Sequence, residues 1–374
     1  MTSLFFYGTL RDRRLLEIVL GRSADSIAAC PARLPGHAVF WVKDAPFPMI
    51  EAVEGQQAEG LLVEGLNQQD LARLNFHEGG FSYDLKPVEV KAEVGIVSTE
   101  VYFPEPGLWP RGEAWSLEAW QARWGPLSHE AALEVMHYFG KRSAEDVSAM
   151  FPMIRARAAA RVNAASARAE NPSGMGRGDV VFAGRNIPYA DYFTMEEHHV
   201  GFRRFDGSQS PTVKRVVFAA TDAVIVLPYD PVRDRVLLIE QFRAGPWARG
   251  DGQPWQLEPI AGRLDAGETP ETTAHREAME EAGLELRELH PVANVYASPG
   301  CSTEYFYVYL AIADLPDDIT GTNGLDSEEE DIRSHLYDFE ELMRLVDELK
   351  AANAPLVLAG LWLARHRESL RASA

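Results

Sequence analysis

The sequence predicts two α/β domains joined by a short linker, and three observations support this prediction. The chain has 374 residues, more than a single compact core usually organises. Strand-like segments precede helical ones up to residue 162, and strand patterns return after residue 179. The stretch between them, residues 165–178, is small, polar and rich in glycine, as flexible linkers are. We therefore expect domains at 1–164 and 179–374.

The first domain is expected to begin with short strands and to end with helices. Residues 4–10 form an apolar run that closes at a glycine-containing turn, and residues 60–63 and 86–90 carry further strand patterns. Residues 115–162 instead place apolar side chains at helical spacing. The pattern predicts a small β-structure with added helices.

The second domain mixes strands and helices. Residues 222–230 and 235–243 are apolar runs on either side of a polar turn, which predicts a hairpin. Residues 304–315 predict another strand, and residues 355–369 predict a terminal helix. Both domains are therefore expected to be of the α/β (α+β) class.

The charge composition restricts the partners of this chain. It has 36 Lys and Arg residues against 56 Asp and Glu residues, a formal net charge of −20. Such a balance argues against nucleic acid or an anionic membrane as the partner, because both would be repelled. A small phosphorylated substrate would need a local cation, which a bound metal ion can supply.

Cysteine content and apolar runs predict a cytoplasmic protein. Cys30 and Cys301 are its two cysteines, too few for a disulfide scaffold. The N-terminus lacks the basic segment and apolar core of a signal peptide, and no apolar run reaches the roughly 18 residues that span a bilayer.

Residues 262–284 hold the most specific motif of the chain. Gly262 is followed after five residues by Glu268, and after seven more by a charged run that starts at Arg276. Thr269 is a good N-cap, and Gly283 suits the left-handed residue that ends a helix. Together with a proline at the first helical position, these residues predict a helix over about 270–282.

Three glutamates of this helix share one face. Glu277 lies three residues before Glu280 and four before Glu281, and such like-charge spacings cost a few tenths of a kcal/mol per pair in an isolated helix. Magnesium would offset the repulsion, since it prefers oxygen ligands and bridges carboxylates to phosphates. Arg276 can also pair with Glu280, four residues later. A solvated charged face is the alternative, and the complete spacing argues against it.

The motif resembles the Nudix box. Its fixed positions are filled by Gly262, Glu268, Arg276 and Gly283. The flanking segments resemble the ADP-ribose pyrophosphatase branch of the Nudix hydrolases, including its tellurite-resistance relatives. The downstream proline of that branch is matched by Pro299, sixteen residues past Gly283. The likeness covers roughly 180–374 and implies an α/β/α sandwich.

The resemblance implies a magnesium site, with manganese as the alternative metal. The implied ligands and their close neighbour are the Ala261 carbonyl, Glu277, Glu280, Glu281 and Glu330. It also implies that Glu328 is the base that activates water. Because residues 328–330 are three consecutive glutamates, the alignment leaves open which of them is the base. Arg243 resembles the arginine that binds the diphosphate of the substrate in this family.

The resemblance implies hydrolysis of ADP-ribose to AMP and ribose 5-phosphate by a homodimer that forms through the Nudix domain. Two alternatives stay open. The Nudix domain could prefer another nucleoside diphosphate compound, such as a sugar nucleotide or NADH. Either domain could also bind its ligand without turnover.

The N-terminal segment carries a second, shorter signature. Its first strand closes with Tyr7, Gly8, Thr9 and Leu10, and Glu78 lies in the phrase HEGGFSY. This succession resembles the γ-glutamylcyclotransferase-like (AIG2-like) fold, a small β-barrel, over about the first 104 residues.

In that fold the turn after the first strand offers backbone N–H groups to the substrate, and a glutamate is the acid and base. The resemblance therefore implies that Glu78 moves a proton while a γ-glutamyl compound releases 5-oxoproline, without a metal. The helices that follow are additional to the resemblance.

Overall fold

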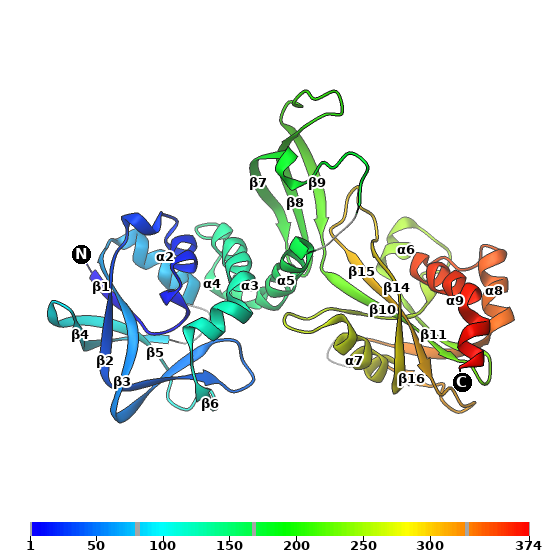
Figure 1. The fold of residues 1–374 in the computed structure, drawn as a ribbon, viewed down its shortest axis with the longest axis horizontal. Coiled ribbons are helices and arrows are strands. Elements are labelled where there is room, and N and C mark those ends of the chain that lie inside the picture. Colours follow the sequence, from blue (N-terminus) through cyan, green and yellow to red (C-terminus); the bar gives the residue numbers. More distant parts are fainter. Residues whose placement is uncertain (1, 79–82, 167–169, 326–328, 374) are drawn as a thin grey trace. The chain divides into compact units, whose positions relative to one another are not determined.

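The chain folds into two compact units, Met1–Ala169 and Glu170–Ala374, which we describe one at a time (Figure 1). The computed structural model describes residues 2–78, 83–166, 170–325 and 329–373. Within these residues, no helix is both long and apolar enough to cross a lipid bilayer.

The first unit is built on a closed β-barrel. The strand order β3-β1-β5-β4-β2 closes on itself because β2 also pairs with β3, while β6 adds to β2. Inward side chains fill the barrel, among them Phe5, Leu62, Val90 and Val101, each at most 1% exposed. This confirms the small barrel predicted for the first domain. The strands are β1 (Thr2–Phe6), β2 (Ala28–Val42), β3 (Pro48–Leu66), β4 (Tyr83–Ala92), β5 (Gly95–Pro104) and β6 (Arg111–Ala114).

Helices follow and interrupt this barrel. The short helices after β1 are η1 (Thr9–Arg11), α1 (Arg13–Leu20) and η2 (Ala24–Ser26), and α2 (Gln68–Glu78) follows β3. The predicted helical segment after the barrel contains α3 (Leu117–His137), α4 (Ala144–Ala149) and α5 (Phe151–Ser166).

A buried ion pair joins α3 to α5. The Arg157 guanidinium donates to one carboxylate oxygen of Glu134 at 2.6 and 3.0 Å, and Arg161 donates to the other at 3.0 Å. The Arg157 and Glu134 side chains are 2% and 0% exposed. Removing either partner would leave a buried charge uncompensated, so this pair fixes the two helices to each other.

The second unit is a mixed sheet between helices. Its strand order is β14-β15-β10-β11-β17-β16, with β13 on β10 and β12 on β11. The strands β10 (Asp222–Asp230) and β11 (Arg235–Phe242) form the predicted hairpin. The other strands are β12 (Trp255–Glu258), β13 (Ile260–Arg263), β14 (Leu286–Tyr296), β15 (Tyr305–Ala313), β16 (Thr322–Asn323) and β17 (Ile332–Asp338).

Side chains of β10 alternate between the two faces of the sheet. Val224 and Val226 pack towards α7, whereas Ile225 and Leu227 pack towards α8 and α9. This arrangement confirms the α/β/α sandwich. The helices of the unit are η3 (Arg177–Asp179), α6 (Ala244–Arg249), α7 (Pro270–Ala282), α8 (Phe339–Asp347) and α9 (Ala354–Ala372).

The helix α7 approaches the sheet through alanines. Ala274, Ala278 and Ala282 are 0–3% exposed and lie in the same cluster as Val224 and Val226. Side chains this small bring the helix axis close to the strands. The acidic side chains next to them in the sequence therefore lie close to the sheet edge.

A separate sheet precedes the sandwich, in the order β7-β8-β9. Sequence analysis did not predict these strands, because their apolar residues are mostly solvent-exposed and give no clear alternation. Large apolar side chains lie exposed on it, including Phe182 at 61% and Tyr189 at 57%. The strands are β7 (Val180–Ala190), β8 (Thr194–Phe202) and β9 (Val213–Ala219).

Candidate functional site

The helix α7 begins and ends where the sequence predicts. The Thr269 hydroxyl accepts a hydrogen bond from the Thr272 N–H at 3.2 Å, which satisfies one free donor of the first turn. Gly283 ends the helix with a φ of 58°, a conformation that glycine adopts at little cost. These caps fix which residues face the preceding loop.

Arg276 ties the loop before α7 to the helix. Its guanidinium donates to Glu268 at 3.0 and 3.1 Å, to the Arg263 carbonyl at 3.1 Å, and to Glu277 at 2.6 Å. It also donates to Glu280 at 3.0 Å, the predicted pair four residues apart. A planar guanidinium with five donors can make all these contacts at once, which lysine cannot.

Gly262 leaves room for the carboxylate of Glu277. A Cβ atom at Gly262 would lie 1.8 Å from the Glu277 carboxyl carbon, so the Glu277 side chain would have to move. The glycine is therefore needed because β13 and the α7 carboxylate touch here. Burial raises the pKa of Glu277 to about 7, against the lowering effect of Arg276.

Glu281 is the most buried carboxylate of the site, at 3% exposure. It accepts a hydrogen bond from the Ala261 N–H at 3.1 Å. Burial, together with the negative charges of Glu277 and Glu330, raises its pKa well above the ordinary value. Buried carboxylates that repel one another are stabilised by a hard cation.

Oxygen donors of this kind fit a magnesium ion in their chemistry. Across the described residues, however, no three His, Cys, Asp or Glu side chains converge in the arrangement of a metal site. Glu277 and Glu280 point to Arg276 instead. The contact of Glu277 with Arg276 is made by Oε1, and a carboxylate has a second oxygen that can bind a cation.

The loop before β17 contributes further acidic groups. Glu330 is half-buried, and its carboxylate accepts the Leu325 N–H at 3.3 Å. Glu329 is exposed and has a φ of 54°. Of these two, Glu330 is therefore turned into the fold. The expected base, Glu328, lies outside the described residues.

Arg243 pairs with a residue that sequence analysis missed. Its guanidinium donates to one carboxylate oxygen of Glu258 at 2.8 and 2.9 Å, and Asn353 donates to the other at 3.1 Å. Glu258 is 6% exposed and ends β12. An acidic residue that closes a short strand was the only signal, and its partner comes directly after another strand, β11.

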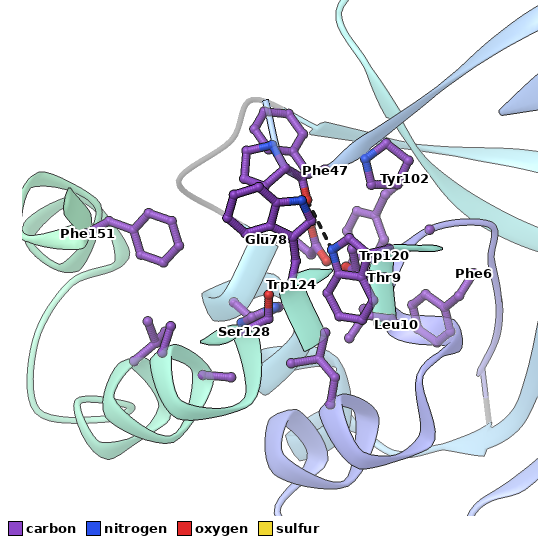
Figure 2. Close-up of a pocket in the computed structure, with 18 of the residues that line it drawn as sticks. Phe6, Thr9, Leu10, Phe47, Glu78, Tyr102, Trp120, Trp124, Ser128 and Phe151 are labelled. Carbon is purple, nitrogen blue, oxygen red and sulfur yellow. Dashed lines mark hydrogen bonds between the residues drawn. The ribbon is translucent and has the colours of Figure 1, made fainter. Parts of the chain in front are cut away.

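The first unit contains a cavity of about 190 Å³ beside the β1 turn. Tyr7, Gly8, Thr9 and Leu10 line it, and so does Glu78 at the end of α2 (Figure 2). The structure thus brings together the predicted residues of this half. Burial raises the pKa of the Glu78 carboxyl to about 7, a value suited to proton transfer at neutral pH.

Other side chains of this cavity were not predicted. Burial lowers the pKa of His77 to about 4, so this lining residue is neutral at pH 7. Trp120 donates from its indole N–H to the Pro46 carbonyl at 3.0 Å (Figure 2). Trp124 and Phe151 come from the helices after the barrel, which the sequence left without a role.

Family models match both units. The NUDIX domain model matches residues 219–359, and the model described as gamma-glutamyl cyclotransferase, AIG2-like, matches residues 4–122. The second unit, a sandwich in which α7 carries the residues of the Nudix box, is thus a Nudix domain. It is fused to a cyclotransferase-like barrel.

The Nudix unit is similar to curated pyrophosphatases. The chain is 38% identical over 200 residues to ADP-ribose pyrophosphatase of Escherichia coli (strain K12), an alignment of 54% of this chain and 95% of that protein. The corresponding enzyme of Haemophilus influenzae is 33% identical over 197 residues, 52% of this chain and 90% of that protein. GDP-mannose pyrophosphatase of E. coli (strain HS) is 31% identical over 156 residues, which cover 42% of this chain and 80% of that protein. The chain belongs to the Nudix family of which ADP-ribose pyrophosphatase is a member.

Proposed function

We propose that the second unit hydrolyses the diphosphate of ADP-ribose to AMP and ribose 5-phosphate. The observation that carries this proposal is the packing of the Glu277 carboxylate against Gly262, next to the buried Glu281. Two carboxylates that are withdrawn from solvent and repel each other fit a site that holds a cation. The name and 38% identity of the E. coli relative support the substrate.

The residues that would hold Mg²⁺ or Mn²⁺ are on α7, on β13 and in the loop before β17. They are Glu277, Glu281, the Ala261 carbonyl and Glu330, with Glu280 close by. Magnesium bound there would neutralise the diphosphate and lower the pKa of a water molecule. In this proposal, the role of Glu328 is to accept a proton from the attacking water.

Arg243 is the proposed diphosphate-binding residue. Its contacts with the buried Glu258 hold the guanidinium in one orientation, and its charge lies near Glu281 and Glu330. A guanidinium held in this way presents its remaining donors to a phosphate, whose geometry it matches.

A hydrolysis panel with ADP-ribose, GDP-mannose and NADH tests the proposal. We expect the highest kcat/KM for ADP-ribose with Mg²⁺, loss of activity with EDTA, and recovery when Mg²⁺ is restored. Glu277→Gln should lower kcat by at least about a hundredfold. The exposed Glu285→Gln is the matched control. Equal turnover after complete chelation would refute the metal site. Faster cleavage of GDP-mannose would instead assign the substrate of the 31%-identical relative.

A second proposed activity belongs to the first unit. We propose that it converts a γ-glutamyl amide to 5-oxoproline and an amine, because Glu78 and the β1 turn line one cavity. The α-amino nitrogen attacks the side-chain amide carbon, the carbon–nitrogen bond of the amide breaks, and Glu78 carries the proton to the leaving amine. Release of 5-oxoproline that is lost in Glu78→Gln would support this. Ligand binding without any release would show a binding module.

We further propose a homodimer through the Nudix unit. The sheet β7-β8-β9 exposes Phe182 and Tyr189 at 61% and 57%, and the loop after β8 exposes Phe205 at 90%. A second copy of the chain would cover this apolar surface. Sedimentation should give twice the monomer mass, and Phe182→Asp should shift the equilibrium to monomer. A wild-type monomer at micromolar concentration would contradict the proposal.

A further inference from the structure

The helices after the barrel form one wall of the Glu78 cavity. Trp124 and Leu127 come from α3, and Phe151 comes from the start of α5. These residues lie beyond residue 122, where the match to the cyclotransferase family model ends. This part of the cavity therefore comes from residues outside the segment that the family model matches.

The same helices are fixed to the β1 turn. Asp12 follows that turn, and its carboxylate accepts from the Gln121 amide at 2.7 Å and lies 2.7 Å from the His129 Nε2. The buried pair of Glu134 and Arg157 then holds α5 on α3. The wall is thus a built part of the cavity, because polar contacts join α3 to the residue after the β1 turn and α5 to α3.

The wall is mainly aromatic and aliphatic, and it also contains three polar residues, Ser128, Ser148 and Arg155. Figure 2 shows the Trp124 and Phe151 rings among the side chains that line the same cavity as Glu78. Arg155 lies over the Trp124 indole, 5.8 Å from the ring centre, a contact that steadies the ring. A charged or strongly hydrated group would lose its water against these rings, whereas a flat apolar group would not.

We propose that this cavity takes γ-glutamyl amides whose amine carries a flat apolar group. This inference rests on the cyclotransferase activity proposed above. The γ-glutamyl part lies at the β1 turn and Glu78, and the apolar group lies against Trp124 and Phe151. The reaction forms the ring carbon–nitrogen bond, breaks the amide bond, and releases the apolar amine with the proton taken from the attacking nitrogen.

A matched pair of amides tests the inference in the full-length chain. The γ-glutamyl amides of 2-phenylethylamine and of ethylamine differ only in a phenyl group. We expect a kcat/KM for 5-oxoproline release that is at least about tenfold higher for the phenyl compound, as burial of a ring provides. Trp124→Ala should reduce this preference to about twofold, and Trp124→Phe should keep most of it.

Leu133→Ala is the control, because this side chain lies on the same helix, α3, but is 40% exposed and does not line the cavity. Equal rates for the two amides would overturn the inference while leaving the cyclotransferase activity intact. If neither amide releases 5-oxoproline, that activity is refuted. Calorimetric binding of both amides to Glu78→Gln then decides the inference: tighter binding of the phenyl compound supports it, and equal affinity overturns it.

Discussion

At the scale of single residues, Gly262 shows how a missing side chain can matter as much as a present one. The Glu277 carboxylate occupies the space that a Cβ atom would need. The position of this carboxylate is therefore set by the strand β13 as well as by its own helix.

We expect Gly262→Ala to displace Glu277 and to lower kcat for diphosphate hydrolysis by at least about a hundredfold, while the far-ultraviolet circular dichroism is unchanged. Gly252→Ala is the control, since nothing lies within 4 Å of the position that its new methyl group would occupy. Full activity in Gly262→Ala would show that the contact has no role.

Glu78 allows a pH prediction at the same scale. Its pKa is raised by burial to about 7, and its carboxylate form must accept the proton in the proposed reaction. The kcat/KM for 5-oxoproline release should therefore be constant above about pH 7.5 and fall about tenfold per unit below pH 7. A pH–rate profile measures this. An acid limb near pH 4.5, the ordinary value for glutamate, would contradict the burial effect.

At the scale of elements, Asp12 connects three of them. It caps α1 by accepting the Leu15 N–H at 2.8 Å, follows η1, and binds two side chains of α3. Burial opposes its ionisation, but the hydrogen bonds from His129, Gln121 and Leu15 outweigh this effect. They lower its pKa from 3.8 to about 2.

Because the folded-state pKa is depressed, the ionised Asp12 stabilises the fold above pH 3.8, and this stabilisation is lost as the pH falls towards 2. We expect Asp12→Asn to lower the free energy of unfolding of the first unit by about 2 kcal/mol at pH 7. The difference from wild type should shrink below pH 3.8. Urea titrations at several pH values measure it. The exposed Asp25→Asn should change little, and an undiminished difference at pH 2.5 would disprove the linkage.

Local features of the elements were predictable from sequence, and distant ones were not. The bounds of α7 follow from Thr269 and Gly283, which act within one helical turn. The pairing of Arg276 with Glu280 follows from their spacing of four. The contact of Arg243 with Glu258 depends on the pairing of β11 with β12, and the presence of Trp124 in the same cavity as Glu78 depends on how α3 docks. No periodicity of the sequence encodes these tertiary contacts.

At the scale of the whole molecule, each unit has its own core. The barrel interior around Leu62 and the two clusters on either side of β10 are built entirely within their own units. Two reactions that share no chemistry are thus proposed on two separately packed supports.

We expect a chain cut within residues 165–178 to give two fragments that each fold and keep their own proposed activity. Differential scanning calorimetry of the intact chain should resolve two transitions, and each fragment should reproduce one within a few degrees. A Nudix fragment that unfolds or loses hydrolysis on separation would show that its stability depends on the barrel.

The alanine stripe of α7 has a consequence for how this enzyme can change. Three alanine methyl groups that take part in no reaction set the distance between α7 and the sheet. They therefore determine how close the glutamates of α7 lie to β13. Larger aliphatic residues at these positions would leave the glutamates of α7 unchanged in the sequence. They would nevertheless move the helix, and with it the glutamates, away from β13. The residues that this helix can accept are thus limited by size on the face that packs on the sheet and by charge on the face that carries the glutamates.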